Sequence, residues 1–114
     1  MALEKVDLSE QRCAACRAGT APMAQPDVAE YLALIGPEWK SPDGGHIERL
    51  FRFANFREAL EFVNAVGAEA ERQGHHPDLE IGWGRVKVRL STHKIKGLSK
   101  NDFILAAHID KLAP

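Results

Sequence analysis

Two stretches of strict alternation, Leu79–Trp83 and Val86–Leu90, constrain the fold of this chain more than any other feature of its sequence. In the first stretch apolar residues alternate with a polar residue or glycine, and in the second they alternate with basic residues. A period of two places the apolar side chains on one face of a strand. With Gly84 and Arg85 as the turn, the two stretches predict an antiparallel hairpin that has one core face and one solvent face.

A second hairpin is predicted upstream of the first. The segment SPDGG, residues 41–45, has the composition of a turn, and Ile47, Phe51 and Phe53 after it share one face at a period of two. Strands are therefore expected near residues 38–41 and 46–54.

A long amphipathic helix is predicted between the two hairpins, over residues 55–74. Asn55 followed three residues later by Glu58 resembles a capping box, and Gly74 supplies a C-terminal stop. Between these signals the apolar residues recur at helical spacing and the charged residues face the other way, which is typical of a helix that covers a sheet.

Shorter helices are predicted towards both ends of the chain, over residues 26–35 and 99–112. The second of these has Ser99 as its N-cap and Asp102 in its first turn. Its apolar residues occupy so much of the circumference that we expect this helix to pack on another chain as well as on its own sheet. These residues are Ile104, Leu105, Ala106, Ala107, Ile109 and Leu112.

The order of the predicted elements is α-β-β-α-β-β-α, which indicates an α+β fold. We expect a two-layer sandwich in which a four-stranded antiparallel sheet carries helices on one face. A chain of 114 residues is long enough for one domain, so residues 1–114 are interpreted as a single domain. Residues 1–25 have no steady period and are predicted to form an N-terminal arm with a helical turn near Leu8–Arg17.

Charge and composition exclude several classes of function. The formal net charge is −1, so no strong global field recruits nucleic acid or an anionic membrane. No apolar run approaches the roughly 20 residues of a membrane span, and the N-terminus has no signal-peptide pattern, which predicts a cytoplasmic protein. Cys13 and Cys16 form a Cys-x-x-Cys motif without the second pair of a zinc site, and we interpret them as reduced and non-catalytic.

Three of the five histidines, His75, His76 and His93, flank the second hairpin. In the register that a Gly84-Arg85 turn implies, position 76 falls opposite position 93, so the three imidazoles should gather at the open end of the hairpin. Neutral imidazole and imidazolium are both accessible near neutral pH, which suits acid–base chemistry.

Other interpretations of these residues stay open. A zinc site of three histidines is the sharper alternative, although adjacent histidines point apart on a strand and no fourth ligand has a familiar spacing. His46 and His108 are interpreted as structural. The basic residues near the second hairpin lack the interleaved aromatics of a nucleic-acid stacking platform, so we expect a solvated face. These basic residues are Arg85, Lys87, Arg89, Lys94, Lys96 and Lys100.

Several separated residues match one known family at its spacing. They are Glu71-x-x-x-His75-His76-Pro77, the aromatic Trp83, STH ending in His93, and GLS followed by Asp102. CAACRAG near the N-terminus, FxxALxFxNxVG in the long helix and KGLSKNDFILAA extend the match over nearly the whole chain. On these residues the chain resembles the bacterial branch of the pterin-4a-carbinolamine dehydratases. It departs from the animal members at Leu79, where an aromatic residue is common, which changes a pocket wall rather than the chemistry.

The resemblance implies a hydro-lyase that dehydrates 4a-hydroxytetrahydropterin to quinonoid dihydropterin, and so recycles the pterin cofactor of aromatic amino-acid hydroxylases. It implies His75 and His93 as an acid–base pair and His76 chiefly as a binding residue, with Glu71 and Asp102 in support. The pterin is the substrate, and no metal or organic cofactor is expected. The expected substrate-binding residues are His75, His76, Pro77, Ser91, Thr92, His93, Lys94 and Ile95.

The resemblance also implies a homo-oligomer, either a dimer or a tetramer, since helices form the core of the family's tetramers. A non-catalytic role on the same fold, as a dimerisation partner or an assembly factor, is the alternative. Relatives with such roles tend to lose the histidine set, whereas this chain keeps all three, which favours the enzyme.

Overall fold

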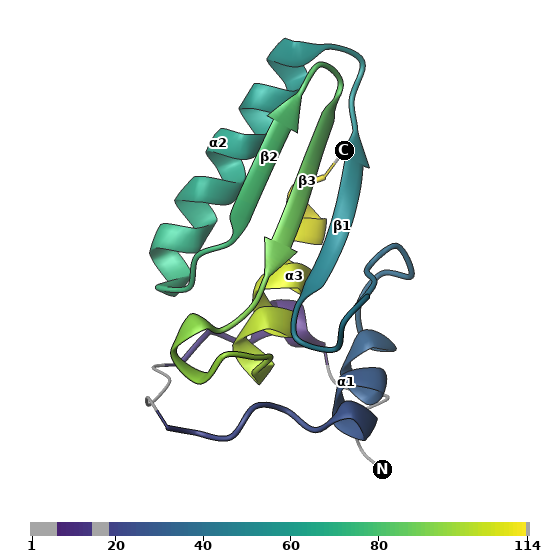
Figure 1. The fold of residues 1–114 in the computed structure, drawn as a ribbon. Coiled ribbons are helices and arrows are strands. Elements are labelled where there is room, and N and C mark those ends of the chain that lie inside the picture. Colours follow the sequence, from purple (N-terminus) through teal and green to yellow (C-terminus); the bar gives the residue numbers. More distant parts are fainter. Residues whose placement is uncertain (1–6, 15–18, 114) are drawn as a thin grey trace.

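A three-stranded antiparallel sheet backed by helices forms the fold (Figure 1). The computed structural model describes residues 7–14 and 19–113. The strands are β1 (Ile47–Arg52), β2 (Asp78–Gly82) and β3 (Arg85–Leu90), in the order β1-β3-β2. The helices are α1 (Gln25–Leu32), α2 (Phe56–Gln73) and α3 (Lys100–Leu112), with the short 3-10 helices η2 (Leu8–Glu10) and η3 (His93–Ile95). The α+β class predicted from the sequence is confirmed.

The central strand β3 shows why the sheet has one covered face. Val86, Val88 and Leu90 are completely buried, whereas Arg85 and Arg89 between them are exposed. Helices α2 and α3 lie behind the sheet in Figure 1, where the apolar side chains of the strands meet them. The alternation in the sequence therefore predicted the core face of this strand correctly.

The register of the β2–β3 hairpin differs from the predicted one by two residues. Gly82 pairs with Arg85, so the turn consists of Trp83 and Gly84, and Trp83 is 74% exposed instead of facing the core. Gly84 takes a positive φ of 69°, and a Cβ there would lie 3.0 Å from the carbonyl oxygen of Phe53. The glycine thus fits the second turn position, where a side chain would be strained.

The predicted four-stranded sheet is wrong in its count, because residues 38–41 form no strand. Their one ladder contact is a bridge between Lys40 and Glu48. Side chains of the turn take over main-chain bonds instead: the Ser41 hydroxyl donates to the carbonyl of His46, and the Asp43 carboxylate accepts from the amide of Gly45. Turn residues that bond the local main chain in this way compete with strand pairing.

The ends of the helices follow the sequence signals. The Asn55 side chain accepts a hydrogen bond from the amide of Glu58 at the start of α2, and Gly74 ends it with a φ of 65°. Ser99 precedes α3, and its amide donates to the carboxylate of Asp102. Helix α1 is shorter than predicted and ends at Leu32.

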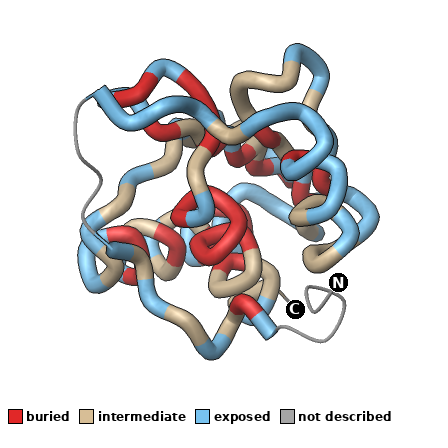
Figure 2. Tube along the Cα trace, turned by 90° about the horizontal axis from the view of Figure 1, so that it is seen from below, coloured by how far each residue is buried: buried red, intermediate tan, exposed pale blue. Residues whose placement is uncertain are grey.

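Helix α3 is covered by its own chain, which corrects the expectation that its apolar circumference packs on another chain. Phe103, Leu105 and Ile109 are completely buried within a single copy. The ring of Tyr31, near the end of α1, packs against that of Phe103 in a tilted arrangement, and η2 packs on α3 through the buried Leu8. Figure 2 shows the buried residues concentrated in the middle of the molecule. The arm and α1 thus provide the cover that the sequence suggested would come from a partner.

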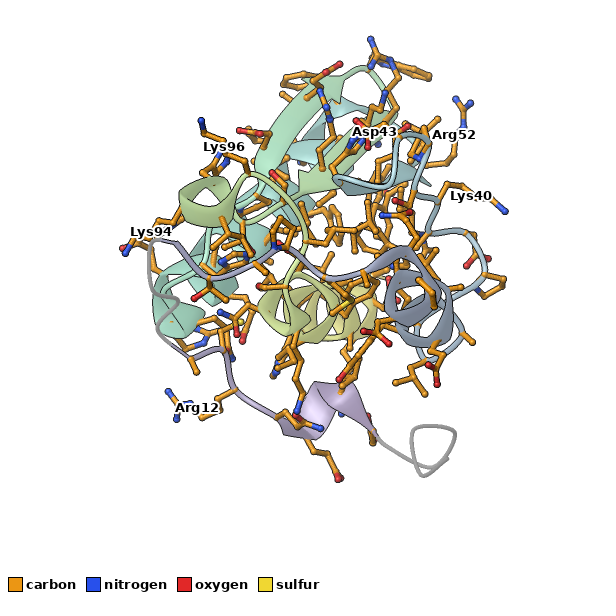
Figure 3. The ribbon with its side chains drawn as sticks, turned by 60° about the horizontal axis from the view of Figure 1, so that its bottom comes forward. Arg12, Lys40, Asp43, Arg52, Lys94 and Lys96 are labelled. Carbon is orange, nitrogen blue, oxygen red and sulfur yellow. The ribbon has the colours of Figure 1, made fainter. Side chains whose placement is uncertain are left out.

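Charged side chains occupy the outside of the molecule. Arg12, Lys40, Arg52, Lys94 and Lys96 are exposed, and Figure 3 shows them projecting from the periphery. Most of the basic residues near the hairpin are exposed as predicted, which fits a solvated face. Within the described ranges, no helix combines the length and the apolar character needed to cross a membrane.

Candidate active site

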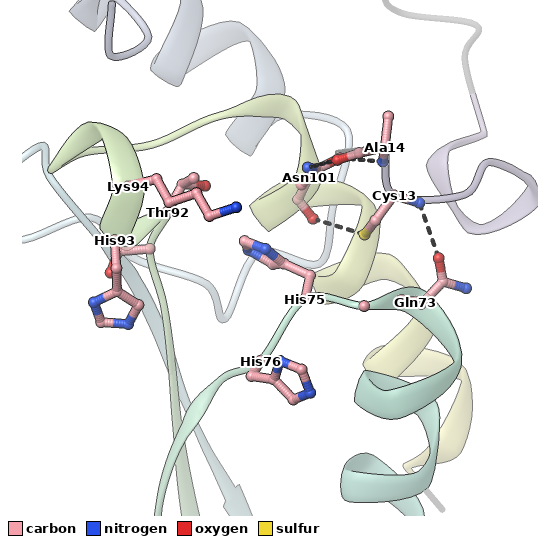
Figure 4. A pocket seen from close by; sticks show the side chains of 11 residues that line it. Cys13, Ala14, Gln73, His75, His76, Thr92, His93, Lys94 and Asn101 are labelled. Atoms are coloured by element: carbon pink, nitrogen blue, oxygen red, sulfur yellow. Dashed lines mark hydrogen bonds between the residues drawn. The ribbon is translucent and has the colours of Figure 1, made fainter. Parts of the chain in front are cut away.

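A cavity of about 440 Å³ lies where α2 ends, β3 ends and α3 begins (Figure 4). Six of the residues predicted from the sequence line it, from both sides of the β2–β3 hairpin. They are His75, His76, Ser91, Thr92, His93 and Lys94. The three histidines are therefore brought to one cavity, although by the hairpin ends and η3 rather than by the predicted pairing of 76 with 93.

His75 and Asp102 form the most buried polar pair of the cavity. The Nε2 atom of His75 lies 2.6 Å from Oδ1 of Asp102, and the His75 side chain is 12% exposed while that of Asp102 is completely buried. Gly74, in the left-handed conformation, turns the chain at the end of α2 so that His75 follows directly beyond the helix. Because the carboxylate accepts the Nε2–H, the Nδ1 atom of His75 is left for a ligand in the cavity.

The second oxygen of Asp102 is held by residues that precede and begin α3. Oδ2 accepts hydrogen bonds from the hydroxyl of Thr92, at 2.8 Å, and from the amide of Ser99, at 2.9 Å. The hydroxyls of Thr92 and Ser99 lie 2.7 Å apart and complete the network. One carboxylate therefore both caps α3 and fixes the ring of His75.

His76 occupies a more open position than His75. Its Nε2 atom lies 2.6 Å from Oε2 of Glu71, and the two side chains are 60% and 77% exposed. Such a solvent-exposed pair contributes little to stability, so its effect is on the orientation of the ring. Glu71 thus contacts His76, and Asp102 contacts His75.

The other predicted site residues divide into two groups. His93, the first residue of η3, is exposed, and Figure 4 shows its ring pointing away from His75 while the side chain of Lys94 extends towards His75. Pro77 and Ile95 do not line the cavity: Pro77 is partly buried beside it, and Ile95 belongs to the buried residues.

Five residues without a predicted site role also line the cavity: Cys13, Ala14, Gln73, Gly74 and Asn101. Asn101 directly precedes Asp102 and Gln73 lies two residues before His75, yet nothing in their spacing indicates that they bond to the arm. Cys13 has a free thiol, and Cys16 lies outside the described residues. In the part of the chain that is described, no three His, Cys, Asp or Glu side chains are grouped so as to hold a metal ion.

Comparison with known proteins bears on these residues. The family model described as pterin 4 alpha carbinolamine dehydratase matches residues 21–112. The chain belongs to this family. It is 46% identical, over 92% of its own length and 95% of the relative's, to a protein of Alkaliphilus metalliredigens that is provisionally named a pterin-4-alpha-carbinolamine dehydratase. The resemblance drawn from the histidine motif is thereby confirmed.

Two solved structures share the fold of this family member. A Brucella melitensis protein described as a transcriptional coactivator/pterin dehydratase superposes with a TM-score of 0.75 at 29% identity, over 82% of this chain and 99% of that one. A pterin dehydratase-like protein described as a RuBisCO assembly factor in the alpha-carboxysome gives a TM-score of 0.57 at 23% identity, over 67% and 89% of the two chains. The second likeness concerns the fold alone.

Most residues that line the cavity belong to the part of this pterin-4-alpha-carbinolamine dehydratase family member that the family model matches. His75, His76, His93 and Asp102 all lie inside residues 21–112, whereas Cys13 and Ala14 lie before them. His46 and His108 lie outside the cavity. His46 contacts Glu48, and His108 donates to the main chain of Gln11, which agrees with their interpretation as structural residues.

Proposed function

We propose that this chain is a hydro-lyase that converts 4a-hydroxytetrahydropterin to quinonoid dihydropterin and water. The observation that carries the proposal is the pairing of His75 with the buried Asp102 in a cavity that His76 and His93 also line. A cavity of about 440 Å³ is within the usual size range of small-molecule sites and suits one bicyclic pterin. The product would again serve an aromatic amino-acid hydroxylase after reduction.

The reaction requires two proton transfers and no change in net charge. The C4a–O bond breaks as the hydroxyl oxygen takes a proton and leaves as water. The electrons of the N5–H bond form the N5=C4a double bond as N5 loses its proton. One imidazole supplies the first proton and another accepts the second, so acid–base groups are sufficient, and we propose that no metal or cofactor takes part.

His75 and His93 are proposed as this acid–base pair. The bond from Nε2 to Asp102 holds the ring of His75 in one orientation. His76, oriented by Glu71, is proposed to bind and orient the pterin. Lys94 and the hydroxyl of Ser91 are further groups on the cavity wall that can bond the polar edge of the pterin ring.

The deciding experiment is the dehydration of freshly generated 4a-hydroxytetrahydropterin by purified protein, followed by absorbance against the spontaneous reaction. A rate no faster than the spontaneous one would leave the non-catalytic alternative, a dimerisation or assembly factor. That alternative is supported by the description of the Brucella melitensis structure, which names a transcriptional coactivator as well as a pterin dehydratase. A cytoplasmic location stays a prediction from the sequence.

Activity is expected to survive prolonged treatment with EDTA, because the proposed proton transfers use imidazoles alone. Elemental analysis of the active protein should find much less than one zinc per chain. Stoichiometric zinc that is lost together with activity would contradict the prediction, and would assign the histidines to a metal instead.

We also propose that the chain forms a homo-oligomer, as its family resemblance implies. Since α3 is covered by its own chain, the apolar candidates for the contact are Phe56 and Leu60 on α2, which are 44% and 43% exposed one turn apart. Light scattering should give a multiple of the 12.6 kDa chain mass. Leu60→Asp is expected to restore the monomer mass, because an unpaired charge in an apolar interface is costly. A wild-type mass of one chain would contradict the proposal.

A further inference from the structure

The described part of the N-terminal arm is bonded to α3 at the edge of the cavity. The amide of Ala14 donates to Oδ1 of Asn101 at 2.9 Å, and Nδ2 of Asn101 donates to the carbonyl of Ala14 at 2.5 Å. Asn101 is 9% exposed, so its side chain is buried by this contact with the arm. The side-chain amide of Asn101 therefore both accepts from and donates to the main chain of Ala14, so both main-chain polar groups of Ala14 are bonded.

A second bond ties the arm to the end of α2. The amide of Cys13 donates to Oε1 of Gln73 at 2.9 Å. Nε2 of Gln73 donates in turn to Oε2 of Glu69 at 2.9 Å. Hydrogen bonds from Gln73 and then from Arg72 lower the pKa of Glu69, so this carboxylate is ionised near neutral pH and accepts only. Glu69 thus holds the amide nitrogen of Gln73, and the amide oxygen of Gln73 is free to accept from Cys13.

Further contacts anchor the arm on the side away from the cavity. Nε2 of His108 donates to the carbonyl of Gln11 at 2.6 Å, and Nδ1 of His108 lies 3.4 Å from Glu69. Leu8 is 1% exposed and packs into the core beside α3. Polar side chains on both α2 and α3 are thus directed to main-chain atoms of one short segment.

Gln73 and Asn101 lie close in the sequence to the hydrogen-bonded pair His75 and Asp102. Gln73 precedes His75 by two residues, Asn101 precedes Asp102 by one, and all of Cys13, Gln73 and Asn101 line the cavity. Figure 4 shows the arm along the edge of the cavity, with its bonds to Gln73 and Asn101 drawn. With its main-chain groups bonded to the helices, the arm contributes Cys13 and Ala14 to the wall of the cavity.

The Cys13 thiol is suited to contact a ligand but not to act as a nucleophile. Burial raises the pKa of Cys13 to about 11, and the nearby charges of Asp102 and Glu69 act in the same direction. The reactive form of cysteine is the thiolate, which is scarce at neutral pH for such a thiol. Its Sγ lies 3.5 Å from the carbonyl oxygen of Asn101, a weak hydrogen bond that adds to the contact between arm and helix.

We infer that Asn101 and Gln73 are positioning residues that hold Cys13 and Ala14 as one wall of the pterin-binding cavity. The arm then contributes to substrate binding without taking part in proton transfer. The inference rests on the proposed dehydratase function and adds to the site a segment that precedes residues 21–112, the range that the family model matches.

Asn101→Ala removes both bonds to Ala14, and Gln73→Met keeps the length of the side chain but removes the acceptor for Cys13. Each is expected to raise KM roughly tenfold, because hydrogen bonds of ordinary strength that hold a binding wall are lost. Both should leave kcat within about threefold of wild type, since the wall binds substrate and transition state alike. Asn64→Ala, the same chemical change at an exposed position of α2, is the control and should change neither constant.

Alkylation of Cys13 by iodoacetamide measures the arm without any turnover. In a Cys16→Ser background, Asn101→Ala and Gln73→Met should each raise the rate of Cys13 alkylation roughly tenfold or more, because release of the arm exposes the partly buried thiol. Addition of 7,8-dihydrobiopterin should slow alkylation of the unmodified arm, because the bound pterin covers the thiol.

The outcomes separate the two proposals. If wild type is active but both variants keep its KM and its alkylation rate, the inference is overturned and the proposed function stands. A loss of kcat at constant KM in both variants would assign Asn101 and Gln73 a merely structural role. If wild type shows no dehydration, the proposed function fails, and protection of Cys13 by dihydrobiopterin still decides whether the arm is a pterin-binding wall.

Discussion

Replacing His75 with glutamine is expected to lower kcat by roughly 10²- to 10⁴-fold, the usual contribution of a positioned acid–base group. The Nε2 amide of glutamine can still donate to Asp102, which accepts from Nε2 of His75 at 2.6 Å, but it cannot exchange a proton in the reaction. The substitution therefore removes the chemistry and keeps the bond to the buried carboxylate. Single-turnover measurements, corrected for spontaneous dehydration, test this expectation.

Comparison with other variants shows whether the loss is chemical. His75→Ala should lose as much activity and also cost roughly 1–3 kcal/mol of folding stability, because Asp102 loses a partner while it stays buried. His76→Ala should act mainly through KM, since this exposed ring is proposed to bind the substrate. His75→Gln with the kcat of wild type would exclude His75 from the acid–base pair.

Leu105→Asp is expected to unfold the chain. Leu105 is completely buried in α3, and truncation of such a leucine alone costs roughly 2–5 kcal/mol. The aspartate adds the cost of a charge in an apolar core, and the sum approaches the roughly 5–15 kcal/mol that hold a typical domain together. Circular dichroism at 25 °C and urea unfolding measure the effect.

Leu50→Asp is the matched control for this substitution, because Leu50 is 42% exposed on β1. It should cost about 1 kcal/mol or less and leave the secondary structure intact. A folded Leu105→Asp monomer, with native circular dichroism and the mass of one chain, would contradict the placement of α3. Such a monomer would restore the earlier expectation that α3 faces a second chain.

The sequence predicted a structural feature correctly where the interaction that produces it joins residues only a few positions apart. Asn55 caps α2 through the amide three residues later, and Gly74 ends it in a conformation that glycine tolerates. The pairing of Ser99 with Asp102 has the same short range. The alternation through β3 predicted its core face, because the two-residue period is a property of the strand itself.

The register of the hairpin depended on one turn. Apart from Trp83, a Gly84-Arg85 turn and a Trp83-Gly84 turn keep the same residues on the core face, because the two registers differ by two residues. Alternation therefore cannot choose between them. The structure favours the turn that places Gly84 at a positive φ, close to the main chain of Phe53. Phe53 directly follows β1 and is distant from the hairpin in the sequence, so the local pattern of the hairpin cannot reveal this contact.

The sequence by itself determined the fold class, the caps of α2 and α3, and the gathering of His75, His76 and His93 at one end of the sheet, since periodicity, capping and motif spacing act locally. Only the tertiary structure decided what covers α3 and what closes the cavity. The cover is Leu8 and α1 of the same chain, and the cavity edge is Cys13 and Ala14, held from 60 and 87 residues away by Gln73 and Asn101. These contacts join a side chain to main-chain groups that are distant in the sequence. Because every residue has such main-chain groups, no residue pattern in the arm indicates which side chains it will bond.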